Sequence, residues 1–188
     1  MLKRLIVALA LMLSSSLAFA RDVAGVALSE TVTLGAKPEL VLNGAGIRSK
    51  FFIKVYVGAL YLPARTRDPG TVLRHTGPVS MHMHFLHSEV SKEKLVKAWN
   101  EGFDTNLDAA GRARLGARIA RFNELFRTAR KGDVIRLDYL PGSGTTVTIN
   151  NESRGVIEGE DFMQAWLRIW LGKHPADADL KQGLLGLD

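Results

Sequence analysis

The period of the apolar residues changes along the chain, and this change limits the folds that the sequence can adopt. Segments rich in β-branched and aromatic residues, typical of strands, lie on both sides of a middle section with helical spacing. The expected strands are 31–34, 39–42, 51–62, 79–86, 133–139, 145–150 and 153–157, and the expected helices are 68–73, 91–103, 108–126, 160–171 and 177–185. Strands in runs, rather than in strict alternation with helices, predict an α+β fold with an antiparallel sheet.

Residues 1–20 are typical of a cleavable signal peptide. Lys3 and Arg4 precede an apolar run, 5–13, and Ala18-Phe19-Ala20 provides small residues at the cleavage positions. The run is shorter than the roughly 20 residues that cross a bilayer. We therefore expect export with cleavage after Ala20, which leaves one domain over 21–188; a retained membrane anchor is the alternative. The chain has no cysteine, so its stability has to come from burial rather than from disulfides.

The charge balance argues against a nucleic-acid partner, and the glycine motif argues against a nucleotide cofactor. Removal of Lys3 and Arg4 lowers the formal charge from +6 to +4, well below what a nucleic-acid binder carries. Gly44-Ala45-Gly46 precedes an expected strand rather than a helix, so it lacks the geometry that cradles a phosphate. We interpret these glycines as a tight bend and predict neither a nucleic-acid partner nor a cofactor.

His82 and His84 lie two residues apart on an expected strand and so point to one face. With His87 or Glu89 as a third ligand they could hold zinc. Met81 and its apolar neighbours should face the core, however, which favours a solvated or stacked histidine pair on the wetter face and no metal.

Arg48 stands among apolar residues, directly before the long strand 51–62. An isolated cation there needs an anionic partner or a ligand. Tyr56 lies eight residues on and therefore on the same face of a regular strand. The pair could hold a carboxylate or a phenolate, or Arg48 could form a structural salt bridge; the residues leave both open.

The second expected helix carries an arginine face, which belongs to the segment Arg112–Lys131. Its arginines are Arg112, Arg114, Arg118, Arg121 and Arg127. A solvated helix face is the simpler interpretation, and docking on a membrane or a partner is the alternative. Elsewhere, Gly142-Ser143-Gly144 lacks the pattern around a nucleophilic serine, and no hydrolase set is found.

Two blocks of sequence resemble the chalcone isomerase superfamily, specifically its bacterial exported chalcone isomerase-like branch. The first is LNGAGIR, 42–48, followed by FIKVYVGALYL, 52–62. The second is GVIEG, 155–159, with a closing helix that ends in WLGK at 173. The resemblance covers nearly all of 21–188. It implies an open-faced β-sandwich: a large antiparallel sheet with helices layered on one side, a ligand cleft between them, and a periplasmic location.

The resemblance also implies roles for individual residues. In the plant enzymes a guanidinium stabilises the enolate during ring closure of a chalcone, and Arg48 falls at that position. Tyr56 stands where the family has a threonine, and Val90-Ser91 stands where the plant enzymes have a tyrosine. Lys94, Lys97 and Asn100 are similar only loosely to the remaining network.

Other members of the superfamily keep the arginine without that chemistry, and some bind fatty acids. We therefore predict a non-catalytic binder of a small amphipathic ligand such as a fatty acid, with Arg48 as anchor and Tyr56 as hydroxyl partner. The alternatives are an isomerase, or intramolecular lyase, that uses Arg48 on an enone, and the docking protein described above. Peripheral membrane contact fits the periplasmic setting.

Overall fold

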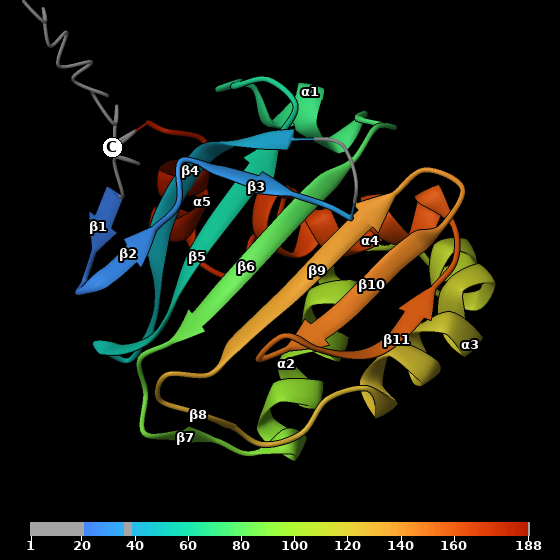
Figure 1. Ribbon diagram of the computed structural model, residues 1–188. Coiled ribbons are helices and arrows are strands. Elements are labelled where there is room, and N and C mark those ends of the chain that lie inside the picture. The colour runs from blue at the N-terminus through green and yellow to red at the C-terminus, as the bar shows by residue number, and fades with distance from the viewer. Residues whose placement is uncertain (1–20, 36–38, 188) are drawn as a thin grey trace, which may run out of the picture.

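The long strand expected over 51–62 forms one arm of a hairpin inside a seven-stranded antiparallel sheet. The computed structural model describes residues 21–35 and 39–187; the predicted signal peptide lies outside them, as does most of 35–38, where the sequence Gly35-Ala36-Lys37-Pro38 predicts a turn between the first two expected strands. The strand order is β11-β10-β9-β6-β5-β4-β3 (Figure 1). Their bounds are β3 Thr31–Thr33, β4 Glu39–Lys50, β5 Ile53–Leu62, β6 Val79–Phe85, β9 Val134–Leu140, β10 Gly144–Ile149 and β11 Glu152–Ile157. The predicted α+β fold with a large antiparallel sheet is confirmed.

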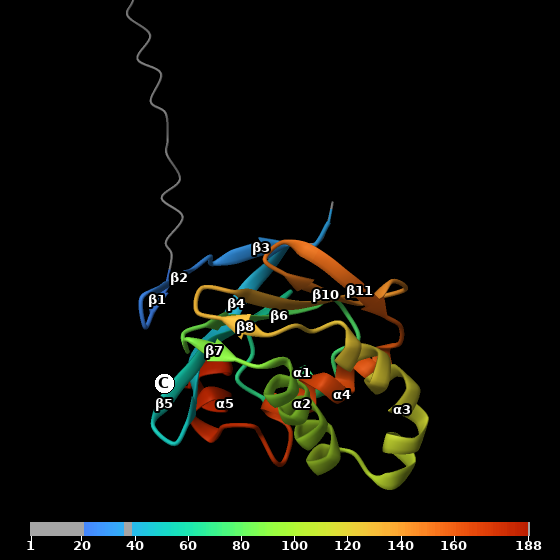
Figure 2. The ribbon, with the colours of Figure 1, turned by 90° about the horizontal axis from the view of Figure 1, so that it is seen from below.

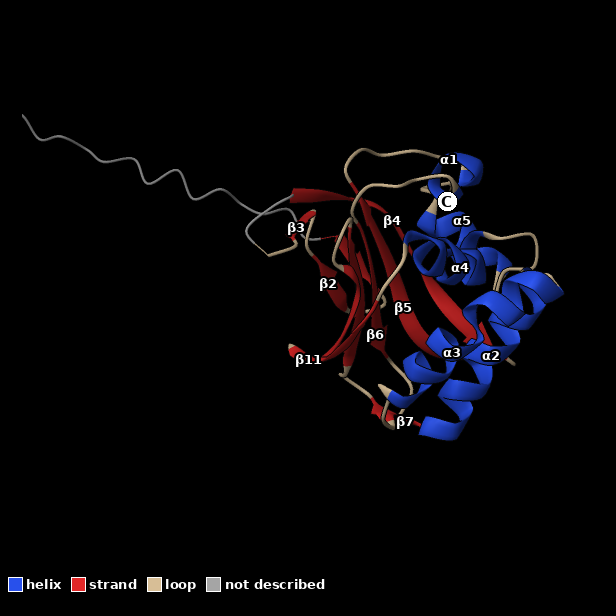
Figure 3. Ribbon diagram, turned by 90° about the vertical axis from the view of Figure 1, so that its right-hand side faces the viewer, coloured by secondary structure: helices blue, strands red, loops and turns tan. Residues whose placement is uncertain are grey.

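The five helices of the described residues lie on one side of this sheet (Figures 2 and 3). They are α1 Pro69–Leu73, α2 Lys92–Asn106, α3 Ala109–Glu124, α4 Glu160–Leu171 and α5 Ala178–Leu184. Their ends follow from side-chain caps: Ser91 accepts from the backbone N–H of Lys94, Asp108 from that of Gly111 and Asp177 from that of Leu180. The helices expected over 91–103, 108–126 and 177–185 begin at these three residues. None of the helices among the described residues is long and apolar enough to cross a membrane.

The main core lies between the sheet and the helices. Alternation along β6 sends Met81, Met83 and Phe85 toward this side. Buried aromatic rings from the helices complete it; Trp99 and Trp170, for example, meet edge to face at 5.6 Å between ring centroids. Burial of large side chains from both layers holds helices and sheet together without a disulfide.

The opposite face of the sheet carries a second, smaller core, which the sequence did not predict. The hairpin of β1 (Arg21–Val23) and β2 (Val26–Leu28) lies on that side and leads into the edge strand β3 (Figure 2). Leu28, Leu40 and Tyr61 are buried there. The expectation that His82 lies on a wetter face is therefore wrong, since its exposed fraction is 8%. Two further short strands, β7 (Glu89–Val90) and β8 (Ala129–Arg130), pair with each other and were also missed.

The Gly44-Ala45-Gly46 segment is not the predicted bend. It lies inside β4, which runs on to Lys50, and its glycines admit the close approach of α5. A Cβ atom on Gly44 would lie 2.2 Å from the carbonyl oxygen of Gly183, and one on Gly46 3.3 Å from the Cα atom of the same residue. The physical need for glycine here is space for a helix backbone, not a positive φ.

Candidate functional site

A cleft of about 620 Å³ opens between the sheet and the helix layer. Its first wall comes from the sheet, at the end of β4, the start of β5 and the end of β6; α2 forms the second wall, and α4 with the segment His174–Ala176 forms the third. Apolar side chains dominate the interior, among them Val55, Phe85, Leu95 and Ile169. Its volume falls within the range of about 300–1,000 Å³ that ligand pockets occupy.

Arg48, on β4, lines this cleft and is also ion-paired. Its Nη1 atom lies 3.3 Å from Oδ2 of Asp177 and also donates to the Ser49 carbonyl oxygen. The exposed fractions are 21% for the Arg48 side chain and 12% for that of Asp177, so the pair is half-buried. The structural salt bridge and the position in a ligand cleft, which the sequence left as alternatives, therefore occur together.

Asp177 is held in place by bonds of its own. Its Oδ2 atom accepts from the backbone N–H of Ser49 at 3.0 Å, and Oδ1 accepts from that of Leu180 at 3.0 Å. A register shift in the β4–β5 pairing falls between Arg48 and Ser49, and bulges of this kind turn side chains toward a site. In the described part of the chain, every hydrogen bond of the Arg48 guanidinium uses Nη1, which leaves Nε and Nη2 available to a ligand.

Tyr56 is the cross-strand partner of Arg48 and lines the same cleft. The two share a face because β4 and β5 pair across a hairpin, not because they belong to one regular strand. The hydroxyl oxygen of Tyr56 accepts from Nε1 of Trp170 at 2.9 Å. Burial raises the pKa of Tyr56 to about 12, although the Trp170 bond and the charge of Arg48 act in the opposite direction. The phenol therefore keeps its proton at neutral pH and can donate it.

Trp99, on α2, adds a polar group that sequence reasoning missed. Its ring lines the cleft and is 3% exposed, and its Nε1 atom has no hydrogen-bond partner among the described residues. A buried donor without a partner costs about 1–3 kcal/mol. A polar ligand atom or a water that accepted this bond would remove the cost. In the sequence, Trp99 shows only the spacing of a core residue, so no signal pointed to this role.

The residues that resemble the family's lysine and asparagine network separate in the structure. Lys94 and Lys97 line the cleft, and Lys97 pairs with Glu101 at 3.8 Å. Asn100 instead accepts from Nδ2 of Asn123 on α3 at 3.0 Å and is not among the cleft residues. The structure thus places two of these three side chains at the site.

The histidine pair lies on the opposite face of the sheet from the cleft. The rings of His82 and His84 are 6.1 Å apart, and burial, aided by Arg136 and by His84, lowers the pKa of His82 to about 3. Nε2 of His82 lies 4.0 Å from a carboxylate oxygen of Asp138; because the imidazole is neutral above its low pKa, this contact is not an ion pair at neutral pH. Residues 21–35 and 39–187 contain no cluster of three metal-ligating side chains.

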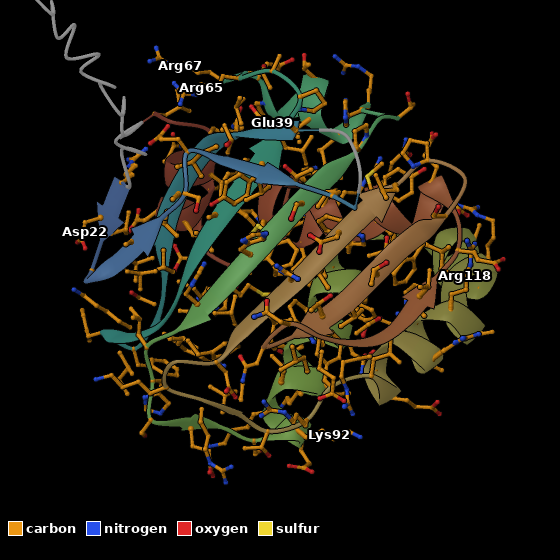
Figure 4. The ribbon with its side chains drawn as sticks, viewed as in Figure 1. Asp22, Glu39, Arg65, Arg67, Lys92 and Arg118 are labelled. Carbon is orange, nitrogen blue, oxygen red and sulfur yellow. The ribbon has the colours of Figure 1, made fainter. Side chains whose placement is uncertain are left out.

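Carboxylates of the protein pair with most arginines of the segment Arg112–Lys131, which consists of α3 and the residues that follow it. Arg118 binds Asp161 through two parallel bonds of 2.7 and 2.8 Å, and Figure 4 shows it on the outer side of α3. Arg112 pairs with Asp104 at 2.7 Å, and Arg127 pairs with Asp133 at 2.9 Å. This pairing fits the solvated helix face and reduces the positive charge that a docking helix would offer.

A second hollow, of about 510 Å³, lies beside the first half of β4, at Leu42 and Asn43. Arg65 and Arg67 extend at the upper edge of the molecule in Figure 4 and line it. Arg65 is already engaged, because it pairs with Glu30 at 2.7 Å and donates to the Leu42 carbonyl oxygen at 2.9 Å. The hollow lacks the apolar interior of the cleft, which is why we take the cleft as the candidate site.

Known proteins share this architecture. The family described as chalcone isomerase-like matches residues 20–186. Among solved structures, the crystal structure of an Arabidopsis thaliana fatty-acid binding protein (AtFAP1) is similar, with a TM-score of 0.68 and 15% sequence identity over 86% of this chain and 92% of that one. At this identity the likeness shows a shared fold. No curated protein sequence matches the chain.

Proposed function

Because this chain belongs to the chalcone isomerase-like family, we propose that it binds a small amphipathic acid, with a fatty acid as the leading candidate, and does so without catalysis. The acid group lies against Arg48 and Tyr56, and the apolar tail runs between the sheet and α2.

The observation that carries the proposal is the half-buried guanidinium at the wall of an apolar cleft. Arg48 presents donors suited to a carboxylate, and Tyr56 beside it retains a proton that it can donate. Charge-assisted bonds of this kind orient an acid, while the apolar walls favour burial of a hydrocarbon tail. The fold shared with a fatty-acid binding protein supports the same ligand class.

Asp177 gives the site a built-in competitor. A ligand carboxylate at Arg48 would meet the Asp177 carboxylate 3.3 Å from the same guanidinium. Since like charges repel, the ligand either shares Arg48 through Nε and Nη2 or displaces Asp177. Affinity for an acid is therefore expected to depend on the charge of Asp177.

We further propose that the protein acts outside the cytoplasm, in the periplasm of a bacterium. The support is the composition of residues 1–20, with a basic start, an apolar run and small residues before position 21. The intact mass of the protein in a periplasmic extract tests this: a mass that begins at Arg21 agrees, and a mass that retains residues 1–20 contradicts cleavage.

The ligand itself is tested by native mass spectrometry of protein purified from its host, followed by titration of delipidated protein with palmitic acid. A carried mass of a fatty acid, or saturable binding of palmitate, is expected. Absence of both would contradict the proposal. Incubation with a chalcone provides the catalytic comparison, because loss of the chalcone absorbance would show an isomerase instead.

A further inference from the structure

The turn between β4 and β5 exposes an aromatic tip. Lys50 and Ile53 are paired at the ends of the two strands, so the loop consists of Phe51 and Phe52 alone. Phe51 is 84% exposed, Phe52 104% and Ile53 51%. Of the five large apolar side chains that are exposed in the described residues, these three are consecutive. Water-exposed apolar groups gathered in this way mark an interaction site.

The backbone of this tip is unusual for such residues. The φ angles are 49° at Phe51 and 65° at Phe52. A two-residue hairpin with positive φ at both positions normally contains asparagine and glycine, because bulky side chains are strained there. Two phenylalanines at these positions strain the backbone and so destabilise the fold, and they gain no burial within the chain in return. Strain of this kind is expected where function requires the side chains.

Lysines flank the aromatic tip on both strands. Lys50 precedes Phe51, with its Nζ atom 6.0 Å from that ring, and Lys54 follows Ile53; both lysines are exposed. The two glutamates that line the cleft are already paired, Glu89 with Arg130 at 3.2 Å and Glu101 with Lys97 at 3.8 Å. Aromatic side chains that are flanked by two ammonium groups match an anionic lipid surface. At such a surface the aromatic rings enter the acyl boundary and the lysines remain at the phosphates.

The tip also stands at the mouth of the cleft. Lys50, Phe51 and Ile53 belong to the cleft lining, and Figures 2 and 3 show the β4–β5 turn extending on the helix side of the sheet. Insertion of this turn into a lipid surface would therefore bring the opening of the cleft to the membrane.

We propose that the Lys50–Lys54 turn is a membrane-docking element, which inserts Phe51 and Phe52 into the surface of an anionic lipid bilayer. This inference goes beyond ligand binding, because docking requires no occupant of the cleft. It also assigns membrane contact to the β4–β5 turn rather than to the arginine face of α3, whose arginines are largely paired.

The test follows a single added indole. The three native tryptophans, Trp99, Trp166 and Trp170, are at most 3% exposed, so a quencher carried on lipid tails does not reach them. The protein is expressed from its full-length sequence, its N-terminus is read by intact mass, and Phe52→Trp is mixed with vesicles of phosphatidylglycerol that carry brominated acyl chains. The control is Val156→Trp, because Val156 is also exposed but lies on β11, the opposite edge of the sheet.

Quenching of the added indole in Phe52→Trp but not in Val156→Trp is expected. Vesicle sedimentation should show that Phe52→Ser weakens binding about tenfold, the loss expected when one phenylalanine is no longer buried. Phe52 has no packing role, so the thermal unfolding of Phe52→Ser should match that of the wild type. Equal quenching of both indoles, no quenching of either, or equal binding to vesicles of phosphatidylglycerol and phosphatidylcholine would overturn the proposal.

Discussion

Arg48 on β4 and Asp177, the residue that caps α5, form a half-buried ion pair of 3.3 Å at the wall of the cleft. The strand and the helix that carry them lie 129 residues apart in sequence, so the pair joins the first half of the sheet to the last helix of the chain. Its consequence for the proposed function is that the anchor of the ligand is already in contact with an anion.

Asp177→Asn should tighten the binding of a fatty acid. The substitution removes the competing charge, yet asparagine remains a good helix cap, so α5 should stay folded. We expect about a fivefold lower dissociation constant for palmitate, which corresponds to about 1 kcal/mol. Titration calorimetry measures it, with Asp179→Asn on the exposed first turn of the same helix as the control. Equal affinity of Asp177→Asn and the wild type would contradict competition at Arg48.

Tyr56→Phe should affect both stability and ligand binding. It leaves the buried N–H of Trp170 without its acceptor, so the free energy of unfolding should fall by about 1–3 kcal/mol. It also removes the hydroxyl proposed to donate to the ligand, so palmitate should bind several times more weakly. Urea unfolding and calorimetry measure the two effects. Tyr139→Phe is the matched control, and unchanged affinity in Tyr56→Phe would remove this residue from the site.

Gly44→Ala should destabilise the fold. The added methyl group would lie 2.2 Å from the carbonyl oxygen of Gly183 and 2.7 Å from that of Leu184. Both are backbone atoms of the α5 segment, so α5 has to move away from β4, and we expect a loss of about 3 kcal/mol in urea unfolding. Gly116→Ala on α3, where nothing lies within 4 Å of the new atom, should be neutral or slightly stabilising. Similar effects of the two substitutions would contradict the close packing of α5.

His82 should contribute to acid sensitivity. Burial lowers its pKa from 6.5 to about 3, so below pH 6.5 the unfolded chain takes up a proton that the native protein does not. His82 therefore does not lower the free energy of unfolding above pH 6.5. As the pH falls from 6.5 toward 3, it lowers that free energy by up to about 1.4 kcal/mol per pH unit. Arg136, Asp138 and His84 face His82 and remain in the variant.

Urea unfolding at pH 7 and pH 4.5 measures the effect in wild type and His82→Gln. The variant should lose about 2–3 kcal/mol less than the wild type between these pH values. His174→Gln, which changes an exposed histidine, is the control and should behave as the wild type. An identical pH dependence of wild type and His82→Gln would show that His82 is not held neutral by the fold.

The sequence predicted those features that depend on local pattern. The helix starts at Ser91, Asp108 and Asp177 and the periodicity of the helices follow from neighbouring residues, and the structure has them where expected. The isolated cation before the long strand pointed to Arg48 and the strand period to Tyr56, the resemblance to a known family added a role for Arg48, and both residues line the cleft.

Features that depend on packing between distant segments were missed or wrong. Gly44 appeared to be a bend, because no local signal shows that α5 packs against it from 139 residues further on. His82 was expected to be wet, because nothing local to it shows that the ring of Tyr61, from the neighbouring strand β5, lies 4.7 Å from its own ring. Asp177 marks the start of a helix in the sequence, but the sequence does not show its contact with Arg48, and Trp99 shows only helical spacing.

The anchoring role of Arg48 is tested most directly by comparing an acid with an uncharged analogue. Calorimetry with palmitic acid and with hexadecanol is performed on the wild type and on Arg48→Met, with Arg48→Met/Asp177→Asn as a second variant in which no charge is left unpaired. A lost bond to a charged group is worth about 1.5–3 kcal/mol, so palmitate should bind about 10- to 100-fold more weakly to both variants. Hexadecanol should bind wild type and variants alike; palmitate affinity that is unchanged, or that falls only as much as hexadecanol affinity, would contradict Arg48 as the anchor of an acidic ligand.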